Sequence, residues 1–146
     1  MNYKVQAHLK PKALSGISND QISQLWKLYE GYVENANRLI EGVARAEAGS
    51  SPWAELKRRL GFEVDGVVLH EYYFGNLACG STLRPAGDLA ADLGAAWGSV
   101  RASSHEQGHP AGFHPVLVLD VFEHAYLVGF GAGGRAEYVA AFLARF

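Results

Sequence analysis

The feature that most constrains the fold is a long amphipathic stretch near the N-terminus. Ser18, followed three residues later by Gln21, forms a capping box that marks the start of a helix. Behind this cap, apolar residues recur at steps of three and four, the period of an α-helix with one buried face; they are Ile22, Leu25, Trp26, Tyr29, Val33, Ala36, Ile40 and Val43. The pattern predicts one helix of about seven turns if it continues to Ala46.

The following segments predict further helices. After the sequence GSSP, a short helix is expected with Ser51 as its cap and Pro52 in its first position. A largely buried helix starts near Asp65, although residues 67–74 are rich in β-branched and aromatic side chains, so a strand is the alternative there. A fourth helix is predicted over residues 87–98.

The C-terminal part mixes strands, turns and one helix. A short strand is expected over residues 98–104, a loop rich in Gly and Pro over 104–115, and a buried strand over 116–122. A glycine-rich turn follows over 129–135, and a last helix over 136–146. Helices followed by a small group of strands predict an α+β fold.

Length and composition fit one globular domain. The chain has 146 residues, of which 49% are hydrophobic and 19% are charged. We therefore expect a single domain over residues 1–146, with an N-terminal helical part (1–48) and a C-terminal α+β part (49–146).

Charge and hydropathy exclude several classes of partner. The formal net charge is −2 and no basic run is longer than Lys57–Arg59, so no general nucleic-acid surface is expected. No apolar run approaches the length of about 18 residues that a membrane span needs, and the N-terminus lacks the apolar region of a signal peptide, so no membrane association is expected. The single cysteine, Cys79, excludes a disulfide within the chain and fits a reducing cytoplasm.

Charged residues directly follow an aliphatic run near the C-terminus. Asp120, Glu123 and His124 come after four aliphatic residues, and buried charge costs several kcal/mol per ion unless it is paired or holds a metal. Along an extended strand, Asp120 and His124 share a face together with Phe122. The pattern predicts either an ion pair at a strand end or part of a metal site. His70 is then either a core histidine satisfied by a hydrogen bond or a further ligand.

Four segments resemble the iron/manganese superoxide dismutase family. LDVFEHAY (119–126) closely resembles the family's Asp-x-Trp-Glu-His-Ala-Tyr signature, and VVLHEYYFGNL (67–77) is similar to its second ligand segment. The stretch 17–42 resembles its first long helix, most closely in GYVENANRLIEG, and residues 103–120 resemble the manganese-type approach to the last strand. The segments occur in the family's order and lie between residues 17 and 126. The resemblance implies a superoxide-dismutase-like fold with a reduced antiparallel sheet.

The resemblance also implies roles for individual residues. The ligands of one iron or manganese ion per chain would be His70, Asp120 and His124. Tyr32 would stand at the mouth of the substrate channel, and Gln107 would hydrogen-bond the metal-bound solvent. Glu123 would reach across a homodimer to the partner's His124.

The first helix departs from the family pattern, in which it carries a histidine ligand. Counting back from Tyr32 places Gln24 at that position, or Leu25 after a one-residue deletion, since offsets of seven and eight both return to nearly the same helix face. A glutamine carbonyl is a weak, hard ligand, so Gln24 is the candidate for a weak fourth ligand. Leu28 and Leu127 replace a further histidine and the tyrosine to which it hydrogen-bonds.

Two further differences concern one residue and the chain's length. Gly66 stands where iron-type members more often have a glutamine, which favours the manganese-type arrangement. The chain is also several dozen residues shorter than is usual for the family, mainly between Leu77 and Gln107.

The predicted function is the dismutation of superoxide to oxygen and peroxide at an iron or manganese site. One alternative is other redox chemistry on a small oxygen species, since two histidines and one carboxylate are also the ligand set of non-haem iron oxygenases. The other alternative is a non-catalytic dimeric scaffold that keeps only the fold.

Overall fold

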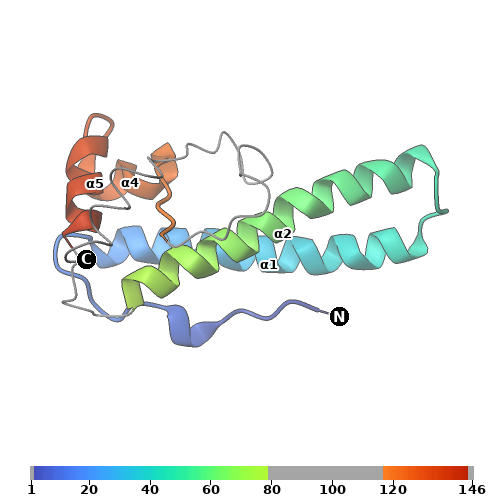
Figure 1. Ribbon diagram of the computed structural model, residues 1–146, viewed down its shortest axis with the longest axis horizontal. Helices are drawn as coiled ribbons and strands as arrows, with labels where there is room; N and C mark the ends of the chain where they lie inside the picture. The colour runs from blue at the N-terminus through green and yellow to red at the C-terminus, as the bar shows by residue number, and fades with distance from the viewer. Residues whose placement is uncertain (1, 79–116, 145–146) are drawn as a thin grey trace, which may run out of the picture.

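The computed structural model of the chain describes residues 2–78 and 117–144 (Figure 1). A 3₁₀ helix, η1 (Ala7–Leu9), precedes two long helices, α1 (Asn19–Arg45) and α2 (Ser51–Ala78). Two short helices, α4 (Glu123–Phe130) and α5 (Arg135–Leu143), complete the described part. Figure 1 shows α1 and α2 side by side as an antiparallel hairpin, with α4 and α5 at the end where α1 begins.

Helix α1 forms where its sequence predicts, but only half of the predicted capping box is made, because the side chain of Gln21 contacts Ala125 and not the backbone of Ser18. Ser18 is the N-cap, and its hydroxyl accepts a hydrogen bond from the backbone N–H of Gln21 at 3.2 Å. The helix ends at Arg45, and Ala46 is its C-cap. The predicted apolar stripe faces the core, and its buried members are Ile22, Leu25, Trp26, Tyr29, Val33 and Ala36.

Helix α2 corrects the prediction of two separate helices. Residues 51–78 form one continuous helix of 28 residues, so the strand alternative for 67–74 is also wrong. The hydroxyl of Ser50, not that of Ser51, accepts the hydrogen bond from the backbone N–H of Trp53 at 3.3 Å. Packing against α1 overrides the β-propensity of the segment, because Val67, Tyr73 and Phe74 all lie in the shared core.

The strand predicted over residues 116–122 is the second correction. Residues 117–121 belong to no strand, and the part of the chain that the structure describes contains only one isolated β-bridge, between Leu14 and Ile17. The segment instead leads into α4, so Asp120 and His124 do not meet on a strand face. Helix α4 also takes up Gly129 and Phe130, and the turn begins at Gly131, whose φ of +73° favours glycine.

The long helical region agrees with the predicted α+β class. Several other predictions lie outside the described residues: the helix over 87–98, the strand over 98–104, the loop over 104–115, Cys79 and Gln107. No helix in residues 2–78 or 117–144 has both the length and the hydropathy needed to cross a membrane.

The core lies between α1 and α2 and is closed by α4 and α5. Trp26 of α1 packs against Phe74 of α2 with ring centroids 4.9 Å apart. Tyr73 of α2 stacks on Phe142 of α5 at 5.7 Å, and its hydroxyl lies 3.0 Å from that of Tyr138. These aromatic contacts join α5 to the hairpin directly beside the segment that carries Asp120.

Candidate metal centre

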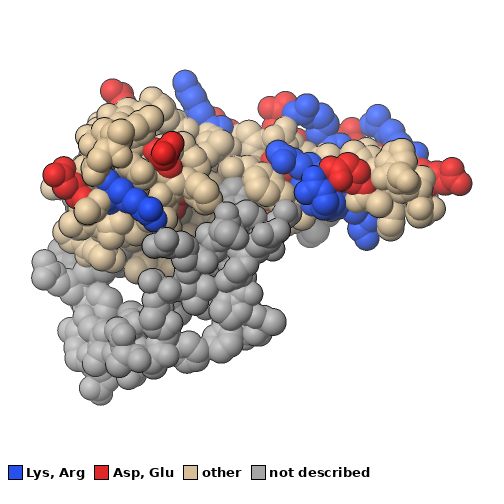
Figure 2. Space-filling model, turned by 90° about the horizontal axis from the view of Figure 1, so that it is seen from above, with Lys and Arg blue, Asp and Glu red and all other residues tan. Residues whose placement is uncertain are grey.

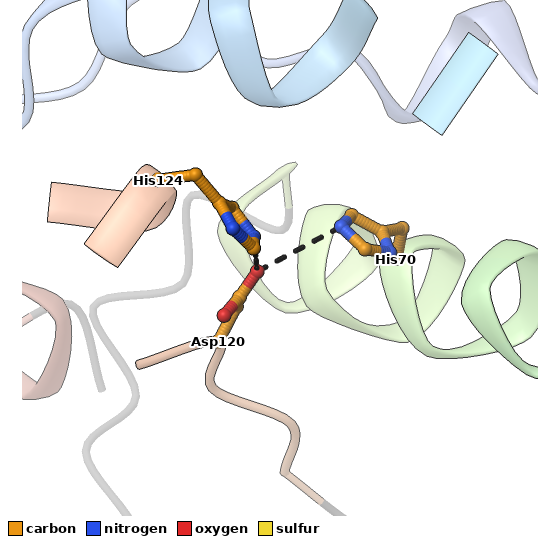
Figure 3. A group of neighbouring side chains, drawn as sticks. All are labelled: His70, Asp120 and His124. Atoms are coloured by element: carbon orange, nitrogen blue, oxygen red, sulfur yellow. Dashed lines mark hydrogen bonds and ion pairs between the residues drawn. The ribbon is translucent and has the colours of Figure 1, made fainter. Parts of the chain in front are cut away.

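Three candidate ligands from separate parts of the chain converge between α2 and the segment that leads into α4 (Figure 3). His70 comes from α2, Asp120 from the segment before α4, and His124 from the first turn of α4. Each residue offers one ligand atom, and these atoms all lie within 4.8 Å of one another. The structure thus brings together the three residues that the sequence singled out as metal ligands.

His70 is held in one tautomer. Its Nδ1 lies 2.7 Å from the backbone carbonyl oxygen of Gly66, one helical turn earlier. A carbonyl only accepts, so Nδ1 carries the proton and donates it, which leaves the lone pair on Nε2. That Nε2 lies 3.8 Å from Oδ2 of Asp120, and the side chain is 3% exposed. A buried imidazole fixed by a backbone carbonyl is the usual state of a metal-binding histidine.

Asp120 ties the two histidines together. Its Oδ1 accepts the backbone N–H of Phe122 at 2.9 Å, an Asx-type turn that leads into α4. Its Oδ2 accepts a hydrogen bond from Nε2 of His124 at 2.8 Å. Burial alone would raise the pKa of Asp120, but the hydrogen bond and charge of His124 and the backbone N–H of Phe122 hold it below its ordinary value. The carboxylate is therefore ionised at neutral pH and suited to a cation.

His124 is the more accessible histidine. Its side chain is 43% exposed, and its ring stacks on that of Phe122 with centroids 5.9 Å apart. The hydrogen bond to Asp120 raises the pKa of His124 above its ordinary value, against the opposing effect of burial. Nε2 carries the proton that it donates to Asp120, so a metal ion that binds this nitrogen would release a proton.

Tyr32 covers the cluster from α1. Its ring packs on that of His70 with centroids 5.1 Å apart. Gly66 makes this approach possible, because a Cβ at that position would lie 2.8 Å from Cδ1 of Tyr32. Burial, followed by the charges of Asp120 and Glu63, raises the pKa of Tyr32 to about 12. The phenol is thus neutral at physiological pH and keeps its proton.

An ion pair with one buried partner, Glu63, was not predicted from the sequence. Glu63 is 2% exposed at its side chain, and its Oε1 pairs with Nη2 of Arg59 at 2.6 Å. Its Oε2 accepts a hydrogen bond from Nδ2 of Asn35 on α1 at 3.3 Å. Glu63 lies seven residues before His70, an offset that returns to the same helix face, and this spacing was the available signal.

The other residues that the sequence analysis singled out differ in their exposure to solvent. Gln24 is exposed on α1, whereas its neighbour Leu25 is 1% exposed and part of the core. Glu123 is exposed on the first turn of α4, and Leu127 is 47% exposed. Gln107 lies outside the described residues.

The donor set fits a first-row transition metal. Two imidazole nitrogens and one carboxylate oxygen suit iron and manganese, and the set contains no thiolate. Within the described ranges, α1 contributes no histidine, cysteine or carboxylate to the group. Three protein ligands leave coordination positions for solvent, substrate or a weak fourth ligand.

Comparison with known proteins decides the family. The family model described as iron/manganese superoxide dismutases, C-terminal domain, matches residues 89–145. An iron superoxide dismutase of Aquifex aeolicus is 31% identical, over 96% of this chain and 85% of its own length. The chain belongs to the iron/manganese superoxide dismutase family.

Other members of the superoxide dismutase family show the same likeness. An iron superoxide dismutase of Aquifex pyrophilus is 31% identical, over 92% of this chain and 82% of its own. A manganese superoxide dismutase of Haloferax volcanii is 27% identical, over 78% of this chain and 74% of its own length. The alignment to the Aquifex aeolicus protein spans 183 positions, more than the 146 residues of this chain. This member of the family is therefore shortened by gaps inside the aligned region, as the sequence predicted.

Proposed function

We propose that this chain binds one iron or manganese ion through His70, Asp120 and His124 and dismutes superoxide to oxygen and peroxide. The observation that carries the proposal is the convergence of both Nε2 atoms on one oxygen of an ionised carboxylate whose side chain is 11% exposed. Relatives named as iron and as manganese superoxide dismutases support the choice of these two metals. Such an ion, when bound, supplies the one-electron chemistry that dismutation requires.

The chain's own residues would bind the ion and shape its surroundings. Asp120 supplies the negative charge, and His70 presents the lone pair of Nε2 because Gly66 holds the proton on Nδ1. Tyr32 narrows access to His70 and holds its phenolic proton. In this proposal Gln107 hydrogen-bonds the solvent on the metal. Gln24 is the weak fourth ligand only if its exposed side chain turns inward.

We also propose that two copies of the chain form a dimer through α4. Three large apolar side chains are exposed here: Phe122 at 48%, Leu127 at 47% and Val128 at 45%. Figure 2 shows few charged side chains over this end of the molecule, whereas charges of both signs are mixed along the hairpin. Glu123 is exposed on the same helix and would reach the partner's His124. Substituting Glu123→Gln is expected to weaken this dimer, which sedimentation velocity would measure.

The first experiment is the metal content of protein purified without added metal, measured by plasma mass spectrometry. The matched variants are His70→Gln, which removes a buried candidate ligand, and His8→Gln, which removes an exposed histidine of η1. We expect near-stoichiometric iron or manganese in the wild type and in His8→Gln, and little in His70→Gln. Equal metal content in both variants would contradict the assigned ligand set.

A superoxide-removal assay on the metal-loaded protein then tests the reaction. Stoichiometric metal with robust superoxide removal supports dismutation. Stoichiometric metal without it would point to other redox chemistry at the same site. A folded, dimeric protein that binds no metal would make the chain a scaffold. The expectation of a cytoplasmic location is tested separately, by fractionation of cells that express the chain.

A further inference from the structure

A buried glutamine joins α1 to α4 next to the metal centre. Gln21 is 0% exposed, and its Nε2 donates a hydrogen bond to the backbone carbonyl oxygen of Ala125 at 2.5 Å. Ala125 directly follows His124 in the first turn of α4. The contact spans 104 positions of sequence.

This contact contains two locally unfavourable features. The Oε1 of Gln21 is buried and has no hydrogen-bond partner in the described part of the chain, although buried polar atoms are nearly always paired. Gly129 lies inside α4, where glycine is less favourable than alanine. A Cβ at Gly129 would lie 2.1 Å from that Oε1, so the glycine is needed for the glutamine to fit. Local rules broken together at one place are typical of a functional requirement.

Helix α4 depends on contacts with other parts of the chain for its stability and orientation. It has only eight residues, and its N-cap, Phe122, makes no side-chain capping hydrogen bond. Ala125 and Gly129 are one helical turn apart on one face, so Gln21 contacts the helix at two successive turns. It therefore fixes both the distance of α4 from α1 and the rotation of α4 about its own axis.

We infer that Gln21 is a positioning residue that holds His124 in place for metal binding. The inference rests on the proposed function of the site. Metal–ligand distances are set to within about 0.2 Å, so a small rotation of α4 moves Nε2 of His124 out of bonding range. In this chain α1 would thus act on the metal site in two ways: Gln21 positions α4, and Tyr32 packs on His70.

The test compares Gln21→Met, which keeps the side-chain length and removes the amide, with Lys27→Met on the exposed face of the same helix. Three quantities are measured: the melting temperature of the metal-free protein, the Mn²⁺ dissociation constant, and the visible absorption of the Co²⁺-loaded protein. For Gln21→Met we expect a melting temperature close to that of the wild type. Its Mn²⁺ dissociation constant should rise about 10- to 100-fold, as after loss of other groups that orient ligands. Its Co²⁺ bands should shift, and Lys27→Met should match the wild type.

Gly129→Ala is the second variant, in case Gln21→Met unfolds. It keeps the amide but places a methyl group where Oε1 lies, so we expect the same rise in dissociation constant and the same spectral shift. If a folded Gln21→Met or Gly129→Ala protein has the wild-type Mn²⁺ affinity and Co²⁺ spectrum, the inference about Gln21 is wrong and the proposed function still stands. Absence of Mn²⁺ and Co²⁺ binding by the wild type would overturn the proposed function and the inference with it.

Discussion

The ion pair of Arg59 and Glu63 offers a quantitative test of how the region behind Tyr32 is held. The substitution Arg59→Met removes the guanidinium that lies 2.6 Å from Glu63 and leaves this carboxylate with Asn35 as its remaining partner. Breaking a fully buried pair costs about 3–5 kcal/mol, because an uncompensated charge stays buried. Here Glu63 is 2% exposed but Arg59 is 48% exposed, so solvent screens part of the interaction. We expect a loss of about 2–3 kcal/mol.

Two further variants isolate the pairing. The double substitution Arg59→Met with Glu63→Leu removes both charges, and it should cost no more than about 1 kcal/mol, because apolar residues of similar volume replace a buried pair well. Arg58→Met is the matched control. It breaks a pair with Glu55 at 2.7 Å in which both side chains are more than half exposed, so its cost should stay below about 1 kcal/mol.

The assay is urea unfolding of the metal-free protein, followed by tryptophan fluorescence, together with thermal melting. In a chain of this size the expected loss for Arg59→Met corresponds to a fall of roughly 5–10 °C in melting temperature. The reasoning is refuted if Arg59→Met is no more destabilising than Arg58→Met. The single variant Glu63→Leu completes the cycle, and the reasoning is refuted equally if the double variant loses as much stability as Arg59→Met and Glu63→Leu added together, since the coupling would then be zero.

Three other predictions concern the cluster itself. Gly66→Ala places a methyl group 2.8 Å from the ring of Tyr32, so melting experiments should show a loss of about 1–2 kcal/mol, and an unchanged melting temperature would contradict the packing described. In the metal-free protein, the lowered pKa of Asp120 gives stability that is full above its ordinary value of 3.8 and lost as pH falls through the lowered pKa. The raised pKa of His124 gives stability that is full below 6.5 and lost as pH rises through the raised pKa. The stability difference between wild type and Asp120→Asn should therefore be largest between these two values and shrink toward pH 9; a constant difference in urea titrations would contradict the pairing. Finally, chelator should lower the melting temperature of the metal-loaded wild type, by the equivalent of about 2.7 kcal/mol when free metal had been 100 times the dissociation constant, and leave His70→Gln unchanged.

The sequence predicted the long first helix because the information is local. The cap at Ser18 and the apolar stripe are properties of neighbouring residues, and packing against α2 only reinforces them. The prediction of two helices in place of α2 is wrong because Asp65 resembles a helix start when its surroundings in the fold are not known. In the structure, glycine at position 66 reflects the close approach of Tyr32 from another helix, which no local pattern contains.

Asp120 and His124 were predicted as candidate ligands, but the strand geometry expected for them is wrong. An offset of four between Asp120 and His124 fits one face of a strand, and it also fits a residue just before a helix and one in its first turn. The aliphatic run over residues 116–119 is compatible with a strand and with a segment that leads into a helix, so it does not distinguish the two. Gln21 and Glu63 were not assigned to the site's surroundings, because the burial of a polar side chain depends on tertiary contacts.

The length of the hairpin has a consequence for how the molecule opens. Helix α2 is about 42 Å long, and Figure 1 shows α1 and α2 extending well past α4 and α5. No residue from 37 to 62 is buried, so this distal half is held by pairing between the two helices and by little apolar burial. Its backbone amides should exchange with deuterated solvent through fraying that starts at the turn near Gly49. The backbone amides around Tyr29 and Phe74 should exchange only when the whole protein unfolds. The candidate metal centre therefore lies in the part of the chain that we expect to exchange slowly, whereas the distal half of the hairpin should open on its own.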